Sequence, residues 1–428
     1  MIKFMYKIYH RYAHTIFFKW IGILYRRGFF VENIRAQGRL KKLAQGKRKN
    51  CDKIKVVFLC QYIPCWNKLS RIFEEMQHDG RFEVKIIAVP EKINNIDDRN
   101  YMYFSERYGK DVVIDAYKES EWYDIRKENA DYVFLQRPYD QYLPELYRSK
   151  NISRFAKVLY VSYGYMLTDT DREICAEKRF FRNIYMYFAE NSYQCKCNIN
   201  RFKRAHKNAW MKTLDLGYPS LENFISKKDT AVEGEETRVL WTPRWTEDKE
   251  VGGSSFMKYK DSVIEYAKKK ENVQLIFRPH PMMFDHFVSV GRLSTKDAES
   301  YINIFDDNKK YVYDRSGDYA STFWNTDILI TDYSSIIVEY FLTEKPIIYC
   351  DVGIKDPDLV FRKIMERMYI VNSWDEVEAM LDKLISGDDP LKDKRREIKK
   401  LIFGQDIQGT SKRIIDSIVN DYKGMEKE

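Results

Sequence analysis

Two polar segments of the chain carry side chains that suit the binding of a phosphate group, and the first is residues 278–281. It reads Arg-Pro-His-Pro and follows an apolar run at 273–277 that is typical of a buried strand. The prolines restrict the backbone around His280, so Arg278 and His280 can both point into a crevice at the end of the strand. A guanidinium and an imidazole can both bind the oxygens of a diphosphate. A histidine at a strand end is more often structural, and this segment alone does not decide between the two roles.

The second segment, residues 331–335, reads Thr-Asp-Tyr-Ser-Ser and lies between an apolar run at 328–330 and a helical pattern. Apolar residues at 336, 337, 340 and 341 have helical spacing, and the run at 347–350 predicts the next buried strand. The start of such a helix has free backbone N–H groups and a partial positive charge, which favour an anion. An ordinary capped helix would give the same pattern. Taken with Arg278 and His280, however, the hydroxyls predict a second wall of one phosphate pocket.

These two segments resemble those of the CDP-glycerol glycerophosphotransferases of teichoic acid and capsule synthesis. Two weaker similarities are Leu-Trp-Thr-Pro-Arg-Trp at 240–245 and Leu-Gly-Tyr-Pro-Ser at 216–220. The resemblance covers roughly residues 155–352 and implies a glycosyltransferase-B architecture, a CDP-linked donor, no metal and no cofactor. The donor-binding residues that we expect on this basis are Pro243, Arg244, Arg278, His280, Thr331, Asp332, Ser334, Ser335 and Glu339. Glu339 could accept a hydrogen bond from a ribose hydroxyl, and a solvated helix face is the alternative for this residue.

The chain departs from the family pattern on the acceptor side. The family has a His-Gly pair after a strand of its first domain, whereas the equivalent stretch here, 158–167, has Tyr163 and Gly164. Tyrosine has an unperturbed pKa of about 10 and is a poor base at neutral pH. Either another group acts as the base, or the acceptor chemistry differs, or activity is lost. On the acceptor side we expect Tyr163, Gly164, Asp169 and Arg137, and Tyr163 joins Arg278 and His280 as a candidate catalytic residue.

The positive charge of the chain is concentrated at its start. The 428 residues have a formal net charge of +9, but residues 1–50 hold 13 Lys and Arg and one Glu, or +12. The other residues hold 60 basic and 63 acidic side chains, or −3, so the body is nearly neutral. Seven scattered cysteines form no disulfide or zinc pattern, which indicates reduced thiols.

Residues 1–50 interleave aromatic and basic side chains. The most apolar piece, 12–25, is interrupted by Lys19 and is too short to span a membrane. Aromatic anchors beside basic residues are typical of contact with an anionic membrane surface, here as a peripheral protein at the cytoplasmic face. A helix packed on the body is the alternative. Nucleic acid is a third reading, which nothing downstream supports, so we expect no nucleic-acid partner.

Alternating apolar runs and helical patterns predict an α/β fold with parallel sheets and crossover helices. With the resemblance, this predicts two Rossmann-like, doubly wound domains: 51–225 on the acceptor side, a linker at 226–237, and 238–428 for the nucleotide donor with the C-terminal helices. Strands are expected at 54–60, 82–89, 112–115, 131–136, 158–162, 238–241, 273–277, 311–313, 328–330 and 347–350. Helices are expected at 69–78, 118–129, 256–270, 318–325, 371–384, 391–403 and 410–422, and the last could fold back across the first domain.

The predicted reaction moves glycerol phosphate, or a related alditol phosphate, from a CDP-linked donor to a hydroxyl of a lipid-linked saccharide or polymer, releasing CMP. Arg278 and His280 would neutralise charge on the transferred phosphate, while Ser334 and Ser335 hold the diphosphate. One alternative is a glycosyltransferase that uses a nucleotide sugar on the same fold. Another is a non-catalytic paralogue that binds donor or polymer, which Tyr163 makes plausible.

Overall fold

A computed structural model describes residues 16–46, 53–168, 178–228, 236–249, 253–306, 310–316, 319–403 and 407–424. For residues 16–28, 400 and 401 it describes the backbone alone. Asp169 and most of the predicted linker at 226–237 lie outside the described residues.

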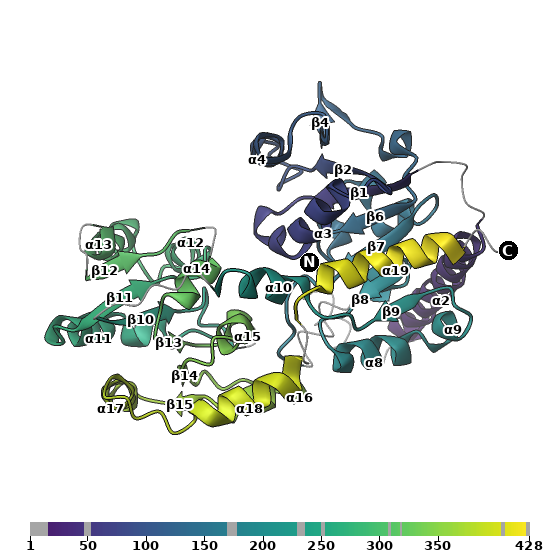
Figure 1. The fold of residues 1–428 in the computed structure, drawn as a ribbon. Coiled ribbons are helices and arrows are strands. Elements are labelled where there is room, and N and C mark those ends of the chain that lie inside the picture. The colour runs from purple at the N-terminus through teal and green to yellow at the C-terminus, as the bar shows by residue number, and fades with distance from the viewer. Residues whose placement is uncertain are drawn as a thin grey trace.

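The first domain is built on a seven-stranded parallel sheet, in the order β3-β2-β1-β6-β7-β8-β9 (Figure 1). The strands are β1 (Ile54–Cys60), β2 (Phe82–Ala88), β3 (Val113–Asp115), β6 (Tyr132–Leu135), β7 (Lys157–Val161), β8 (Met186–Phe188) and β9 (Lys212–Leu214). The helices of this domain are α3 (Asn67–Gln77), α4 (Arg99–Tyr108), α5 (Ser149–Ile152), α7 (Lys178–Phe181), α8 (Ser192–Arg201), α9 (Lys203–Lys207) and α10 (Pro219–Ile225). The apolar runs predicted as strands are buried, as parallel strands covered on both faces should be.

The second domain has a six-stranded parallel sheet in the order β12-β11-β10-β13-β14-β15. Its strands are β10 (Thr237–Thr242), β11 (Val273–Phe277), β12 (Tyr311–Tyr313), β13 (Ile328–Thr331), β14 (Ile347–Cys350) and β15 (Tyr369–Val371). Its helices are α11 (Phe256–Lys269), α12 (Met283–Ser289), α13 (Thr295–Asp306), α14 (Tyr319–Trp324), α15 (Ile336–Phe341), α16 (Leu359–Met365), α17 (Trp374–Ile385) and α18 (Lys392–Phe403). The structure therefore confirms two doubly wound α/β domains.

Both sheets have a point at which the strand order reverses. In the first domain this point lies between β1 and β6, and in the second between β10 and β13. Loops that follow neighbouring strands diverge at such a point and leave a crevice, which is where open α/β sheets bind ligands. The residues just after β10 and β13 are therefore the ones that the fold places around a ligand.

Two sequence-based helix predictions are wrong in part. The helix predicted at 118–129 is instead a small antiparallel hairpin, β4 (Tyr117–Lys118) with β5 (Glu121–Trp122), followed by the 3-10 helix η2 (Ile125–Glu128). Glu119 and Ser120 form its turn with positive φ angles of 56° and 67°, which no helix accommodates. The helix predicted at 371–384 begins only at Trp374, after Ser373 caps it, because Val371 ends strand β15. Strands β8 and β9 are three residues each and were not predicted.

The last helix, α19 (Thr410–Gly424), lies across the first domain, as predicted (Figure 1). Its buried Asp421 accepts hydrogen bonds from the hydroxyls of Tyr132 and Tyr185 at 2.7 and 2.8 Å. It also pairs with Lys157 at 2.7 Å and with Lys212. Tyr132, Lys157 and Lys212 lie on β6, β7 and β9, and Tyr185 immediately precedes β8, so one carboxylate fastens the end of the chain to this part of the first sheet.

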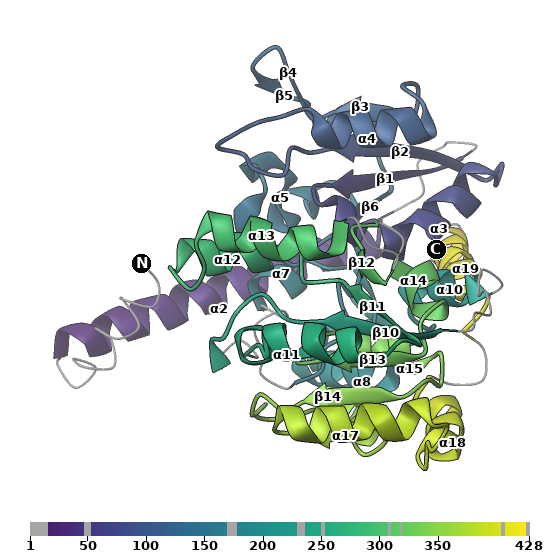
Figure 2. The same cartoon turned by 90° about the vertical axis from the view of Figure 1, so that its left-hand side faces the viewer.

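The early helix α2 (Ile16–Ala44) packs on the first domain through its C-terminal part. Ala36 and Leu40 are buried, and Arg39 donates to Ser153 at 3.1 Å and to Asn183 at 2.8 Å. Glu32 pairs with Lys150 at 3.3 Å. The other end of α2 runs out beyond the body in Figure 2. Within the described ranges we find no helix that combines the length and the apolar character needed to span a bilayer.

We expect Asp421→Asn to destabilise the protein by about 3 kcal/mol, because it leaves buried Lys157 without its counter-charge. Urea unfolding followed by circular dichroism measures this change. Asp416→Asn, the same substitution on the same helix, is the matched control and should have a much smaller effect. Equal stability of the two variants would show that the Asp421 cluster does not hold α19 in place.

Candidate functional site

Three strand ends of the second domain meet in one wall, and backbone hydrogen bonds hold them together. The amide of Arg278, after β11, donates to the carbonyl of Trp241 on β10 at 2.9 Å. The amide of His280 donates to the carbonyl of Pro243 at 3.1 Å. The amide of Arg244 donates to Asp332, after β13, at 2.8 Å. The structure thus brings together the segments at 243–244, 278–281 and 331–335 that the sequence singled out.

Arg278 is held in place by partners that the sequence did not reveal. Its guanidinium pairs with Asp314 at 2.7 Å, donates to the carbonyl of Ser316 at 3.0 Å and lies 5.8 Å from the ring of Tyr319. Burial alone would raise the pKa of Asp314, but a hydrogen bond from Thr322 and the charge of Arg278 hold it below its ordinary value. Asp314 therefore stays ionised at neutral pH, and Arg278 is fixed with part of its side chain exposed.

His280 is an uncharged donor in the free protein. Its Nδ1 atom accepts the amide N–H of Met282 at 3.2 Å, so the neutral ring carries its proton on Nε2. Burial, followed by the charge of Arg244, lowers the pKa of His280 to about 4. In the free protein the neutral ring can therefore offer an N–H group, and charge neutralisation by His280 beside a bound phosphate stays a prediction.

Thr331 and Asp332 support the wall from inside and do not face the cleft. Both side chains are fully buried. The Thr331 hydroxyl bonds to that of Thr242 at 2.8 Å, and Asp332 accepts hydrogen bonds from the amides of Arg244 and Ser255, both at 2.8 Å. Burial raises the pKa of Asp332 to about 6, against these hydrogen bonds. The expectation that both residues contact a donor is corrected, since their oxygens are already used within the protein.

Arg244, Ser334 and Ser335 form the surface of this wall. The Arg244 guanidinium stacks 4.8 Å from the ring of Tyr333 and donates to its carbonyl at 3.0 Å. Ser335 is exposed at the start of α15 and makes no side-chain capping bond, while Ser334 is partly exposed. A cation and two hydroxyls are therefore presented on one side of the strand ends. Pro243 contributes the carbonyl that positions His280.

Glu339 lies on α15 and faces the first domain. It is 8% exposed, which excludes the solvated helix face. Its Oε2 atom is buried and has no hydrogen-bond partner among the described residues. Burial raises the pKa of Glu339 to about 7. The pKa of Tyr218 is raised mainly by its own burial, and the nearby charge of Glu339 adds to this effect. A buried carboxyl oxygen without a partner can accept a hydrogen bond from a ligand.

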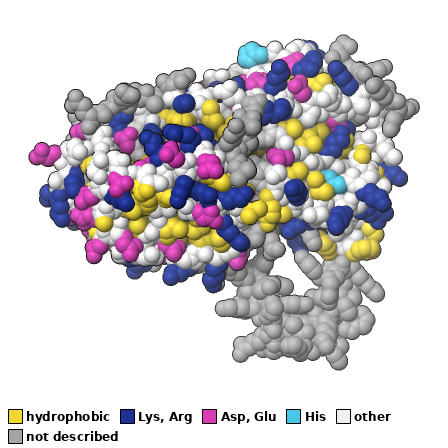
Figure 3. Space-filling model, turned by 60° about the horizontal axis from the view of Figure 1, so that its bottom comes forward, with side chains coloured by type: hydrophobic (Ala, Val, Ile, Leu, Met, Phe, Trp, Pro, Cys, Tyr) yellow, Lys and Arg dark blue, Asp and Glu magenta, His cyan; other side chains and the backbone are white. Residues whose placement is uncertain are grey.

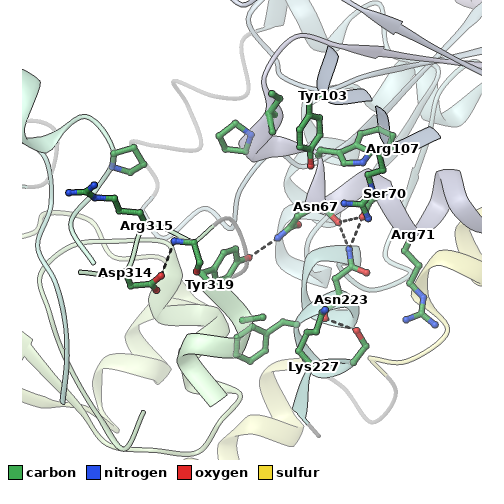
Figure 4. Close-up of a pocket in the computed structure, with 18 of the residues that line it drawn as sticks. Asn67, Ser70, Arg71, Tyr103, Arg107, Asn223, Lys227, Asp314, Arg315 and Tyr319 are labelled. Atoms are coloured by element: carbon green, nitrogen blue, oxygen red, sulfur yellow. Dashed lines mark hydrogen bonds between the residues drawn. The ribbon is translucent and has the colours of Figure 1, made fainter. Parts of the chain in front are cut away.

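Only the 278–281 segment of this wall, through Arg278, Pro279 and Pro281, is among the described lining of a cleft between the domains, which has a volume of about 1290 Å³ (Figure 4). The other predicted donor and acceptor residues are not among the described residues that line it. Arg278, Arg315 and Tyr319 line it from the second domain, and Asn67 and Asn223 are among the lining residues of the first. Figure 4 shows Asn67 and Tyr319 meeting across the cleft, where the Asn67 amide donates to the Tyr319 hydroxyl at 2.8 Å. This hydrogen bond joins α3 to α14 and helps to set how the two domains face each other.

On the first domain, Tyr163 and Arg137 lie in one cluster at the ends of β7 and β6. The Tyr163 ring packs edge-on against Tyr139 at 5.6 Å, and Tyr139 packs against Tyr142 at 6.0 Å. Arg137 lies 6.0 Å from the same Tyr142 ring and donates to Gln61 at 2.9 Å. Gly164 follows in a bend, with space beside it that a Cβ atom would fill without a clash. Asp169 is outside the described residues.

Two buried ionisable residues at this edge were not predicted. Lys68, 2% exposed, donates to the carbonyls of Gln136 at 2.6 Å and Val161 at 3.0 Å, which follow β6 and end β7. Burial lowers the pKa of Lys68 to about 7. Glu190, 4% exposed, has a raised pKa because of burial, and its Oε1 atom has no partner in the described part of the chain. The signal for Lys68 was its place among the buried positions of α3, where 68, 72 and 76 share one stripe.

The chain matches the model of a known protein family. Residues 164–420 match the family model "CDP-Glycerol:Poly(glycerophosphate) glycerophosphotransferase". The chain belongs to this family. The match begins at Gly164, immediately after Tyr163. No curated protein sequence matches the chain.

Solved structures with similar folds confirm the glycosyltransferase-B-like architecture. The wall teichoic acid polymerase TagF is 14% identical, with a TM-score of 0.55 over 95% of this chain and 99% of that chain. A putative UDP-N-acetylglucosamine 2-epimerase from Listeria monocytogenes is 12% identical, with a TM-score of 0.58 over 87% of this chain and 97% of that chain. Identities this low show the fold alone. Among the described residues no group of His, Cys, Asp and Glu side chains could hold a metal ion.

We expect the buried Lys68 to make stability depend on pH. Its pKa of about 7 lies below the value of about 10.4 in the unfolded chain, so the folded state binds fewer protons between these values. Deprotonation of Lys68 should therefore increase the free energy of unfolding as pH rises from 7 to 10. Urea unfolding at pH 7.0 and 8.5 should show that the free energy of unfolding rises less with pH in Lys68→Met than in wild type. Exposed Lys110→Met is the control, and equal slopes for wild type and Lys68→Met would contradict the assignment.

Proposed function

We propose that this protein transfers glycerol phosphate, or a related alditol phosphate, from a CDP-linked donor to an acceptor hydroxyl, with CMP leaving. The observation that supports the proposal is that hydrogen bonds join the loops that carry Arg244, Arg278 with His280, and Ser334–Ser335 at the strand-order reversal of the second domain. Membership of the glycerophosphotransferase family supports this donor.

In this reaction the acceptor oxygen forms a bond to the phosphorus that carries the alditol. The bond from this phosphorus to the bridging oxygen breaks, and CMP leaves with that oxygen. Arg278, held by Asp314, supplies a fixed positive charge beside the transferred group. The Nε2–H of neutral His280 donates a hydrogen bond to a phosphate oxygen. Donors that are already oriented stabilise developing charge without reorganisation, which is the main need of a loose phosphoryl transition state.

The rest of the donor would be held by Arg244, by the serine hydroxyls and by Glu339. Ser334 and Ser335 would bind the diphosphate beside the Arg244 guanidinium. The Oε2 atom of Glu339, which has no partner among the described residues, would accept a hydrogen bond from a ribose hydroxyl. Asp332 and Thr331 act as positioning residues, because their side chains hold the loops from beneath.

The acceptor would approach from the cluster of Tyr163 and Arg137 on the first domain. We propose a lipid-linked saccharide or polymer as the acceptor. Residues 1–50 would hold the enzyme on the cytoplasmic face of the membrane as a peripheral protein. Their +12 charge and interleaved aromatic side chains support this attachment.

A second candidate function is a non-catalytic protein that binds the donor or the polymer. Tyr163 favours it, since tyrosine stands where the family resemblance expects the base. CMP release in the presence of an acceptor separates the two functions. Assays with CDP-glycerol, CDP-ribitol and UDP-sugars also test the nucleotide-sugar alternative.

We expect Arg278→Ala and His280→Ala each to lower turnover by about a hundredfold, because each removes a contact to the transferred phosphate. CMP release measured with saturating CDP-glycerol would report the change. Arg81→Ala is the control, since Arg81 pairs with Asp79 on an exposed surface of the first domain. Normal turnover in both wall variants, with folding intact, would refute the donor site.

We expect Tyr163→His to raise turnover and to add an ionisation near pH 6.5 to the profile of kcat/KM, because imidazole is a better base at neutral pH. Tyr163→Phe, which keeps the ring without the hydroxyl, should leave turnover unchanged. Complete loss of activity in Tyr163→His would show that the tyrosine has a role of its own. Inactivity of all three proteins with every donor would favour the non-catalytic function.

A further inference from the structure

A small basic cavity lies on the first domain between α2 and the pair α8–α9, with a volume of about 260 Å³. Four cationic side chains line it: Arg182, Arg201, Lys203 and Arg204. No Asp or Glu is among the described residues that line it. Lys203 and Arg204 are exposed at the mouth, while Arg182 is half-buried beneath Asn33, to whose Oδ1 atom it donates at 3.4 Å.

Such a concentration of positive charge indicates an anionic ligand. Guanidinium groups bind phosphate oxygens through paired N–H donors, and lysine adds a mobile charge. The Asn33 and Gln37 amides in the lining can add uncharged hydrogen bonds. The cavity is smaller than sites that enclose whole drug-sized molecules, so it fits a single phosphate-bearing group.

The outer face of α2 beside this cavity is apolar. Phe30 is 65% exposed, Val31 44% and Ile34 52%, and they are followed on the same helix by exposed Arg35, Lys41 and Lys42. Ile199 on α8 is also exposed, next to Asn200 in the cavity wall. Figure 3 views this side of the molecule and shows hydrophobic and basic side chains together. Exposed apolar side chains flanked by basic ones are typical of a surface that enters the interface of an anionic bilayer.

We propose that the α2–α8–α9 cavity binds the phosphate of an anionic phospholipid headgroup while Phe30, Val31 and Ile34 enter the membrane interface. The inference deepens the proposed membrane attachment and rests on it, and it names the site and its ligand. A nucleic acid would not explain the apolar side chains, and a soluble phosphate would not require them. Together the cavity and the apolar face favour a ligand with a charged head and an apolar tail.

The packing of α2 gives this contact a consequence for the whole enzyme. Arg39 and Glu32 clamp the helix to Ser153, Asn183 and Lys150 of the first domain. A membrane contact through this face would therefore fix the orientation of the body on the bilayer. A flexible tether would leave that orientation free.

The test uses full-length protein and sedimentation with two kinds of vesicle, phosphatidylcholine alone and phosphatidylcholine with phosphatidylglycerol. We expect the double variant Lys203→Glu/Arg204→Glu to bind the anionic vesicles about a hundredfold more weakly, since each basic residue close to the surface adds to the attraction. Lys268→Glu/Lys269→Glu on α11, exposed and of equal charge change, is the matched control. It should bind nearly as wild type does, because charges beyond a Debye length are screened. Equal losses of vesicle binding in both double variants would contradict a specific site and would indicate general electrostatic attraction between the protein and the anionic membrane.

Two further measurements separate the remaining outcomes. Ile34→Asp should weaken vesicle binding with the cavity intact, and unchanged binding would overturn the role of the apolar face. Inorganic phosphate should compete only weakly with vesicles; full competition at low millimolar phosphate would indicate a site for soluble anions instead. CMP release with a soluble acceptor should be the same in the Lys203→Glu/Arg204→Glu protein as in wild type, so failure of the transferase proposal is distinguishable from failure of this one.

Discussion

The wall formed by the segments at 243–244, 278–281 and 331–335 depends on one buried carboxylate, that of Asp332. One of its oxygens accepts the amide of Arg244, and the other accepts the amide and the hydroxyl of Ser255 at 2.8 and 3.1 Å. A buried carboxylate without such partners would be strongly unfavourable, so these hydrogen bonds are what permits its burial. They tie the loops after β10 to the end of β13. The position of His280 follows, because its amide is held by the carbonyl of Pro243 in the same loop.

The other half of the cleft depends on the end of the chain. Asp421 on α19 binds side chains on β6, β7 and β9 and the residue just before β8. Glu222 on α10 accepts the amides of Gly409 and Ser411 at 2.6 and 2.8 Å. The chain therefore passes through the second domain and returns before the first is complete. Asn67 with Tyr319, and Trp324 with the carbonyl of Phe224 at 2.9 Å, then set the two domains against each other. These distant contacts therefore fix how the first domain meets the second.

Features encoded within a short stretch of sequence could be predicted. Strands such as Ile328–Thr331 are continuous apolar runs, and the segments at 278–281 and 331–335 follow them directly. The sheet and the position of these two segments at its strand ends could therefore be predicted. Features that depend on distant partners could not. Asp314, at the end of another strand, holds Arg278 in place. Ser254 and Ser255 donate hydrogen bonds to the buried Asp332, so this residue supports the loops and does not present its side chain to a ligand. The helix predicted at 118–129 failed because two left-handed residues that are not glycine make the turn.

Phosphorus-31 NMR of the reaction itself tests the central claim most directly. The full-length protein would be incubated with CDP-glycerol and an acceptor saccharide carried on anionic vesicles. The account predicts that the diphosphate signals disappear while CMP and a new phosphodiester appear in equal amounts. Unchanged diphosphate, or CMP accompanied only by free glycerol phosphate, would contradict the claim that this wall transfers the alditol phosphate to an acceptor.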